Sequence, residues 1–305
     1  MSEAVPAPIG AVAHYNLLER LDPSGPGELF RARDTRLGRT VTLRLLPESY
    51  ASDAAARVRL LDRVGLIRAL SHANVTTVFD AGEHDGRVYL VFEWLQGQSL
   101  RAEMAGRPMN VRRAVELAIQ IGDGIAEAMA AGFAHGGLSP DSVVITAKGH
   151  VKIPAFELAA RAGFEESPDG VRLRDYDAPE EARGEIPDER SDIYSVGAVL
   201  YEMLTTKRPS HKGAAAPSAS NPHVPRELDE VVLRAVAPDP DARYQSAVTL
   251  AAELRSVAAI LDVRGGDEDE TTAAWNSTSV GRVALLALLM LLVIAGLIWL
   301  GVRPR

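Results

Sequence analysis

The side chains that carry out chemistry in most enzymes are sparse or scattered in this sequence. The 305 residues include no cysteine, which excludes disulfides, thiolate zinc sites and cysteine nucleophiles together. The seven histidines are scattered and lack the spacing of metal ligands. Any metal would have to be held by carboxylates, and the sequence predicts no metal site.

Groups that bind phosphate are also few. The chain has four lysines, and none precedes Lys148. No asparagine lies between Asn110 and Asn221, and no aspartate lies between Asp141 and Asp169. The net charge of -8, from 33 basic and 41 acidic residues, gives little support for nucleic-acid binding, which needs a basic face. We expect proteins or small molecules as partners, and no nucleic acid.

Strands and one helix are predicted for the part of the chain before residue 95. Residues 29–34 and 40–46 predict paired strands around a turn, and residues 87–94 predict a further strand. Between them, apolar residues recur at helical intervals over residues 54–70. We therefore expect a small β-rich lobe that contains one helix.

The rest of the chain is mainly helical in pattern. Asn110 is a suitable N-cap for a helix over residues 111–133. Residues 193–204 and 247–261 have the apolar composition of further helices. Residues 206–227, rich in proline, serine and alanine, predict a long surface loop.

Four strings occur in the order and at the spacing that bacterial serine/threonine protein kinases show. They are Ser71-His72-Ala73-Asn74-Val75, Tyr176-Asp177-Ala178-Pro179-Glu180, Ser191-Asp192-Ile193-Tyr194-Ser195-Val196-Gly197 and Asp239-Pro240-Asp241-Ala242-Arg243-Tyr244. Over residues 15–262 the chain therefore resembles this family. The resemblance implies an α+β, two-lobed protein-kinase-like fold, with a small β-rich N-lobe at residues 15–94 and a larger α-helical C-lobe at residues 98–262.

The resemblance also shows which catalytic groups the chain has lost. An active kinase pairs a strand lysine with a helix glutamate, uses an aspartate, a lysine and an asparagine in its catalytic loop, and binds magnesium through a further aspartate. The matching positions hold Arg44, Arg63, Gly137, Ser139, Ser142 and Ala155. Two arginines cannot form the ion pair, and the base and both metal ligands are gone. No catalytic residue is therefore expected.

The surroundings of a bound nucleotide are altered as well. The glycine-rich loop reads Asp22-Pro23-Ser24-Gly25-Pro26-Gly27, so an acid faces the phosphates and two prolines remove amide donors. Thr42 replaces the alanine that touches the adenine in the family. The residues that would surround a nucleotide, if one binds weakly, are Asp22, Ser24, Gly27, Thr42, Arg44, Glu93, Leu95 and Val144. No cofactor is expected in this reading.

Residues that hold the fold of the family are retained. By resemblance, five of them form the stacked column that joins the lobes, namely Ile67, Val78, His135, Phe156 and Asp192. Glu180 and Arg243 match a buried ion pair of the large lobe, and removal of one partner of such a pair typically costs about 3 to 5 kcal/mol. A chain that keeps these groups and loses the catalytic ones resembles a pseudokinase, a binding module that acts as a scaffold or allosteric regulator in signalling.

Two alternatives stay open. A slow or atypical serine/threonine kinase would use ATP and magnesium, with Arg44 on a phosphate, Asp141 as a displaced base and Glu157 on the metal. A nucleotide or small-molecule sensor would keep the pocket without catalysis. Salt-bridged or solvated side chains are the simpler explanation for all three residues.

A long apolar run lies near the end of the sequence. Residues 283–302 are uncharged, and about 20 helical residues match the roughly 30 Å hydrocarbon core of a bilayer. The sequence predicts a transmembrane helix over residues 282–302, an acidic and polar linker over residues 263–281 before it, and a short tail at residues 303–305.

The start of the chain indicates the side of the membrane. Residues 1–14 predict a flexible tail and have no basic segment followed by an apolar core, so they do not form a secretory signal. We expect a single-pass protein of the cell inner membrane whose kinase-like domain faces the cytoplasm. Other proteins, including active kinases, are the expected partners.

Overall fold

The computed structural model describes residues 7–21, 27–48, 54–154 and 175–263. Two compact units, Met1–Val257 and Ala258–Arg305, make up the chain. The second unit is described only over residues 258–263, which are helical. The lobes below both belong to the first unit.

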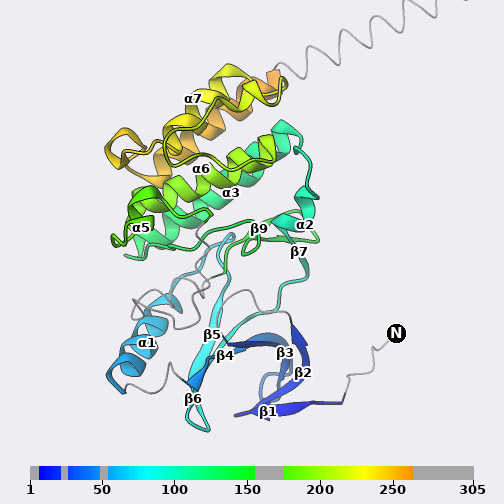
Figure 1. Ribbon diagram of the computed structural model, residues 1–305. Helices are drawn as coiled ribbons and strands as arrows, with labels where there is room; N and C mark the ends of the chain where they lie inside the picture. The colour runs from blue at the N-terminus through cyan, green and yellow to red at the C-terminus, as the bar shows by residue number, and fades with distance from the viewer. Residues whose placement is uncertain (1–6, 22–26, 49–53, 155–174, 264–305) are drawn as a thin grey trace, which may run out of the picture. The chain divides into compact units, whose positions relative to one another are not determined.

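The small lobe is built on an antiparallel sheet with the order β1-β2-β3-β4-β6-β5 (Figure 1). Its strands are β1 Gly10–Val12, β2 Tyr15–Leu21, β3 Glu28–Asp34, β4 Arg39–Leu45, β5 Val78–His84 and β6 Arg87–Glu93. The predicted turn between β3 and β4 is present. Asp34 Oδ1 stabilises it by accepting the backbone N–H groups of Arg36 and Leu37, both at 3.0 Å. Gly38 in this turn adopts φ of 64°.

The first strand corrects the prediction that residues 1–14 form a flexible tail. Residues 10–12 pair with β2 in register, with Val12 opposite Tyr15. The Ile9 backbone N–H donates to Leu17 O at 2.8 Å, and the Val12 side chain is buried. One buried valine and a set of ladder hydrogen bonds are enough to hold this short edge strand.

Helix α1, Ala54–Ile67, lies alongside β5 and closes one core of the small lobe (Figure 1). It ends before Leu70, where the sequence pattern placed its end. Val64 and Ile67 of this helix pack in the same buried cluster as Val78. Two of the residues expected in the stacked column, Ile67 and Val78, are therefore neighbours in this core.

The large lobe is mainly helical. Its elements are β7 Gly97–Ser99, α2 Leu100–Met104, α3 Val111–Ala130, β8 Val144–Thr146, β9 Val151–Lys152, α5 Pro179–Ala182, α6 Glu189–Thr205, η2 Pro217–Ala219, α7 Arg226–Ala235 and η3 Pro240–Ala242. The Asn110 side chain accepts the Arg113 backbone N–H at 3.2 Å and caps α3, as predicted. Helices α3 and α6 pack on each other, and residues 247–263 form a last helix.

Short elements account for the differences from the predicted pattern. The region predicted as a loop, residues 206–227, contains the 3-10 turn η2 and the first residues of α7. A three-stranded sheet in the order β7-β8-β9, which sequence periodicity did not indicate, begins the large lobe. Gly97 is required there, because a Cβ atom at this position would lie 2.1 Å from the Ile145 carbonyl oxygen.

No helix within the described ranges is both long enough and apolar enough to cross a membrane. The predicted transmembrane helix over residues 282–302 lies outside those ranges.

Candidate functional site

The loop from His135 to Ser142 keeps its shape through its main chain. The carboxylate of Asp192, on α6, accepts the backbone N–H of His135 at 2.6 Å and that of Gly136 at 2.7 Å. Asp192 is 0% exposed, and His135 is also buried. Because both donors are amides, this contact fixes the loop without using any side chain of the loop.

Two serines occupy the interior of the same loop. The Ser142 hydroxyl donates to Ser139 O at 3.0 Å, and the Ser139 backbone N–H donates to Ser142 Oγ at 3.1 Å. The Ser142 backbone N–H in turn donates to Ser139 Oγ at 3.3 Å, and both side chains are buried. Neutral hydroxyls that bond to each other do not fit magnesium, which prefers carboxylate oxygens and water.

Asp141, the candidate displaced base, is held by an arginine. Arg101 on α2 donates to Asp141 through NH2 at 3.1 Å, to Glu202 Oε1 at 2.6 Å and to the Tyr176 hydroxyl at 2.5 Å. The Tyr176 hydroxyl also donates to Glu202. To act as a base, Asp141 would have to give up its contact with the Arg101 guanidinium, so this contact weighs against that role.

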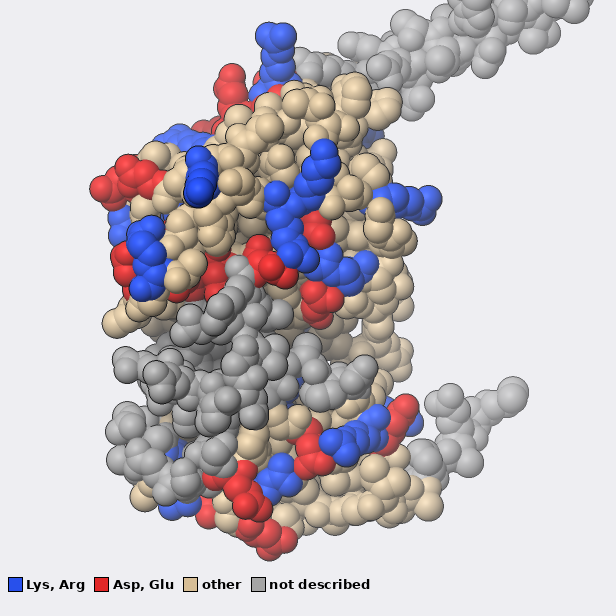
Figure 2. Space-filling model, viewed as in Figure 1, with Lys and Arg blue, Asp and Glu red and all other residues tan. Residues whose placement is uncertain are grey.

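The contacts within the cluster of Arg101, Asp141, Glu202 and Tyr176 shift the pKa values of two of its members. Burial raises the pKa of Tyr176, and the hydrogen bond to Glu202 adds to this effect. Burial opposes protonation of Arg101, but its hydrogen bonds to Asp141, Tyr176 and Glu202 raise its pKa overall. On the face shown in Figure 2, basic and acidic side chains of the large lobe are interspersed.

The residues expected around a nucleotide are only partly described. Arg44 lies on β4 opposite Leu29 and is 5% exposed, so its guanidinium is buried in the small lobe. The hydroxyl of Thr42 donates to Glu93 O at 3.3 Å, which brings β4 against the connection between the lobes. Arg63 lies on α1, but its side chain is outside what can be described.

Three more of the residues predicted to surround a nucleotide are described: Gly27, Leu95 and Val144. Gly27 adopts φ of 86°, and a Cβ atom there would lie 2.3 Å from Leu45 O, so glycine is required. Leu95 and Val144 are half-buried. The remaining predicted positions, Asp22, Ser24, Ala155, Phe156 and Glu157, lie outside the described residues.

No group of three His, Asp or Glu side chains in the described ranges is placed to hold a metal ion.

A lysine that the sequence reasoning passed over contacts the connection between the lobes. Lys152 Nζ lies 2.6 Å from Glu93 Oε1. Glu93 is one of the predicted nucleotide-binding positions through its place in the connection, and its side chain forms this ion pair. The sequence could have drawn attention to Lys152, because it is one of only four lysines in the chain.

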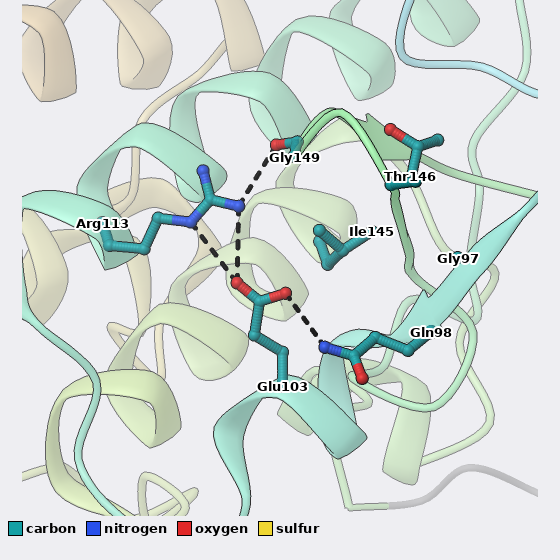
Figure 3. A pocket seen from close by; sticks show the side chains of 8 residues that line it. Gly97, Gln98, Glu103, Arg113, Ile145, Thr146 and Gly149 are labelled. Atoms are coloured by element: carbon teal, nitrogen blue, oxygen red, sulfur yellow. Dashed lines mark hydrogen bonds and ion pairs between the residues drawn. The ribbon is translucent and has the colours of Figure 1, made fainter.

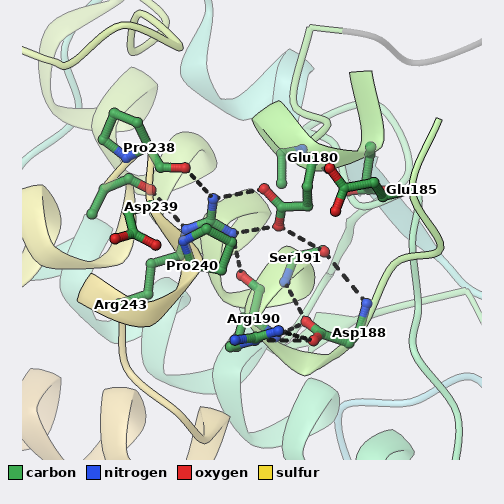
Figure 4. A network of polar contacts seen from close by, with 12 residues as sticks. Glu180, Glu185, Asp188, Arg190, Ser191, Pro238, Asp239, Pro240 and Arg243 are labelled. Atoms are coloured by element: carbon green, nitrogen blue, oxygen red, sulfur yellow. Dashed lines mark hydrogen bonds and ion pairs between the residues drawn. The ribbon is translucent and has the colours of Figure 1, made fainter. Parts of the chain in front are cut away.

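The ion pair expected in the large lobe is present (Figure 4). Arg243 binds Glu180 with both terminal nitrogens, at 2.6 and 2.8 Å. Burial would raise the pKa of Glu180, but the hydrogen bonds from Arg243 and Ser191 lower it overall. Arg243 also donates to the carbonyl oxygens of Ala237, Arg190 and Pro238.

A surface hollow of about 470 Å³ lies on the large lobe, lined by residues of β7, α2, α3 and the β8–β9 hairpin (Figure 3). Arg113 and Glu103 form an ion pair of 3.3 Å across it, and Arg113 also donates to Gly149 O at 3.2 Å. Gln98 donates to Glu103 at 3.5 Å. The polar groups of the hollow thus bind each other, and the hollow offers no chemistry of its own.

A family profile described as protein kinase domain matches residues 17–250. The chain belongs to the protein kinase family. Among curated kinases, a probable serine/threonine-protein kinase of Streptomyces coelicolor is 31% identical over 290 residues, 88% of this chain and 42% of that protein. PrkC of Bacillus subtilis, a serine/threonine-protein kinase, is 29% identical over 79% of this chain and 40% of its own length. The chain spans about two fifths of the length of these relatives.

Solved kinase structures share the fold. The kinase domain of Mycobacterium tuberculosis PknI superposes with a TM-score of 0.68 at 22% identity, covering 85% of this chain and 100% of that domain. The two-lobed kinase fold, with a β-rich N-lobe and a helical C-lobe, is thereby confirmed. Within this fold, β4, α1 and the loop of His135 to Ser142 contain five of the positions that the sequence analysis predicts to be substituted: Arg44, Arg63, Gly137, Ser139 and Ser142.

Proposed function

We propose that this kinase-family chain is a pseudokinase, a protein-binding scaffold or allosteric regulator in signalling that does not transfer phosphate. The mutual hydrogen bonds of Ser139 and Ser142 carry this proposal. These bonds turn the Ser139 and Ser142 side chains inward onto each other. Arranged in this way, the two serines offer neither a base nor a metal ligand.

The ion pair of Arg101 and Asp141 supports the same proposal. Asp141 is the one acidic side chain of the loop, and Arg101 contacts both of its oxygens. The ATP and magnesium of the family have no role in this proposal, and no cofactor is required.

A slow or atypical serine/threonine kinase is the second candidate. Membership of the family and the curated kinases at about 30% identity favour it. For such a kinase to work, the Arg44 side chain would have to leave its buried position and reach a phosphate. Asp141 would also have to separate from Arg101. Detection of catalysis would decide between the two candidates.

The deciding experiment measures transfer of labelled phosphate from magnesium-ATP to the chain itself and to a general protein substrate. Active kinases turn over at about 1 to 100 per second, and loss of one base or charge-stabilising group costs about a hundredfold to a thousandfold. Because several groups are missing, we expect a rate below roughly 0.001 per second, although the losses do not simply add. A faster rate that Asp141→Ala or Arg44→Ala abolishes would establish the kinase instead.

We further propose that residues 282–302 anchor the chain once in the cell inner membrane, with the kinase-like domain in the cytoplasm. The apolar, uncharged sequence of this segment supports the anchor. Other proteins, including active kinases, are the proposed partners.

A further inference from the structure

The connection between the lobes is held by an ion pair that the proposed function does not use. Glu93 is the last residue of β6, and the connection starts directly after it. Its Oε1 atom accepts Lys152 Nζ at 2.6 Å and the Thr77 backbone N–H at 3.0 Å. Lys152 is the last residue of β9, in the large lobe. The ion pair therefore joins the two lobes.

The main chain of Glu93 is fixed from two further directions. Its N–H donates to Thr77 O at 3.0 Å, and its carbonyl oxygen accepts the Thr42 hydroxyl at 3.3 Å. Lys152 Nζ also donates to Val75 O at 3.2 Å. Strand β4, the segment before β5 and strand β9 thus meet at one residue.

A row of hydrogen bonds continues this contact along β9. The Ile153 backbone N–H donates to Asn74 O at 2.8 Å, and the Thr76 backbone N–H donates to Ile153 O at 2.9 Å. The Asn74 side chain donates to Val151 O at 3.0 Å. Residues 74–76, just before β5 of the small lobe, are therefore bound to the large lobe.

The environment of the ion pair favours a strong contact. The side chain of Lys152 is 17% exposed and that of Glu93 is 25% exposed. Charge-assisted hydrogen bonds are stronger than neutral ones, and partial burial reduces screening by salt. Every group in the contact belongs to the protein, so the contact needs no ligand.

We propose that Lys152 and Glu93 form a clamp that fixes the angle between the lobes in the absence of any nucleotide. Lys152 acts as a positioning residue that holds the connection through Glu93. This inference rests on the proposed function, because a scaffold that does not use nucleotide must preform a surface spanning both lobes by protein contacts alone.

The absence of cysteine makes a direct measurement simple. Spin labels at Leu37→Cys in the small lobe and Ile186→Cys in the large lobe would occupy side chains that are 66% and 86% exposed. Pulsed EPR on the full chain in non-ionic detergent then gives the distribution of distances between the lobes. We expect a narrow distribution that magnesium-ATP does not change. Narrowing on addition of magnesium-ATP would overturn the claim that no ligand is needed.

Lys152→Met tests the clamp itself, with Lys148→Met as the matched control. Lys148 lies in the turn between β8 and β9, and its side chain is exposed. We expect a broader distance distribution in K152M and an unchanged one in K148M. We also expect the amides of Thr77 and Glu93 to exchange with solvent about tenfold faster in K152M, since each loses part of its hydrogen-bond support.

Equal distance distributions and equal exchange rates in K152M and K148M would overturn the clamp. If circular dichroism shows that K152M does not fold, Glu93→Gln takes its place, because the amide oxygen still accepts the Thr77 N–H but lacks the charge that binds Lys152. Unchanged distances and exchange in E93Q would overturn the clamp equally. Phosphotransfer by the chain would refute the proposed function and leave these distances unaffected, so the two failures are distinguishable.

Discussion

Replacement of Arg243 by methionine should destabilise the large lobe more than any exposed arginine replacement. The Arg243 side chain is fully buried, and Glu180 is nearly so. In the variant, the Ser191 hydroxyl, at 2.9 Å, would be the one side-chain donor to Glu180 among the described residues. The carbonyl oxygens of Ala237 and Pro238 would lose their donor as well.

The size of the effect follows from the charge that is left behind. Removal of one partner from a buried ion pair costs about 3 to 5 kcal/mol, because the other charge stays buried and uncompensated. For domains of roughly 150 to 250 residues, 1 kcal/mol lowers the melting temperature by about 2 to 4 °C. We therefore expect the melting temperature of R243M to fall by at least about 6 °C.

Arg190→Met is the matched control for this experiment. Arg190 lies beside the same network but pairs with Asp188 and Asp241 at the surface (Figure 4). Exposed pairs contribute about 0 to 1 kcal/mol. Urea unfolding followed by circular dichroism gives the free energy of unfolding of both variants. If R243M loses no more than R190M, the ion pair does not stabilise the fold as argued here.

Three further predictions follow from the site and the sequence. Magnesium-ATP at about 1 mM should leave the melting curve unchanged, because a Kd above about 10 mM adds only about 0.06 kcal/mol, and a rise of several degrees would contradict this. The full chain should resist carbonate extraction from membranes, whereas a fragment that ends at Asp262 should be soluble, and release of the full chain by carbonate would refute the anchor at residues 282–302. The pKa of Glu180 is lower in the folded state, so its contribution to stability is complete above the ordinary carboxyl range and declines as the pH falls through it; acid titration of Glu180→Gln should show a shallower loss than the parent chain.

Much of the fold was predictable because its signals are local. The alternation of β3 and β4, the Asn110 cap and the apolar face of α3 each depend on a few neighbouring residues. Strand β1 was missed because one buried side chain, Val12, decides it, and a three-residue strand has no detectable period. The sheet of β7, β8 and β9 was missed for the same reason.

The contacts of the candidate site could not be predicted from the sequence. The sequence predicts substitutions at Ser139 and Ser142, but the hydrogen bonds between these residues depend on the curvature of the loop. The partners of Arg101 come from α6 and from Tyr176, far along the chain. Sequence periodicity carries no information on such pairs, because tertiary packing alone brings them together.

The hydrogen bonds from the loop of His135 to Ser142 to the Asp192 carboxylate affect which mutations this protein tolerates. Its carboxylate accepts the backbone N–H groups of His135 and Gly136, which every residue type except proline supplies. This contact therefore does not depend on which side chains His135 and Gly137 carry. In a saturation mutagenesis experiment scored for folding, Gly137 should accept more substitutions than Asp192, whose loss removes the acceptor itself. A lineage could in this way discard phosphotransfer chemistry gradually and keep the same surface on offer to partners throughout.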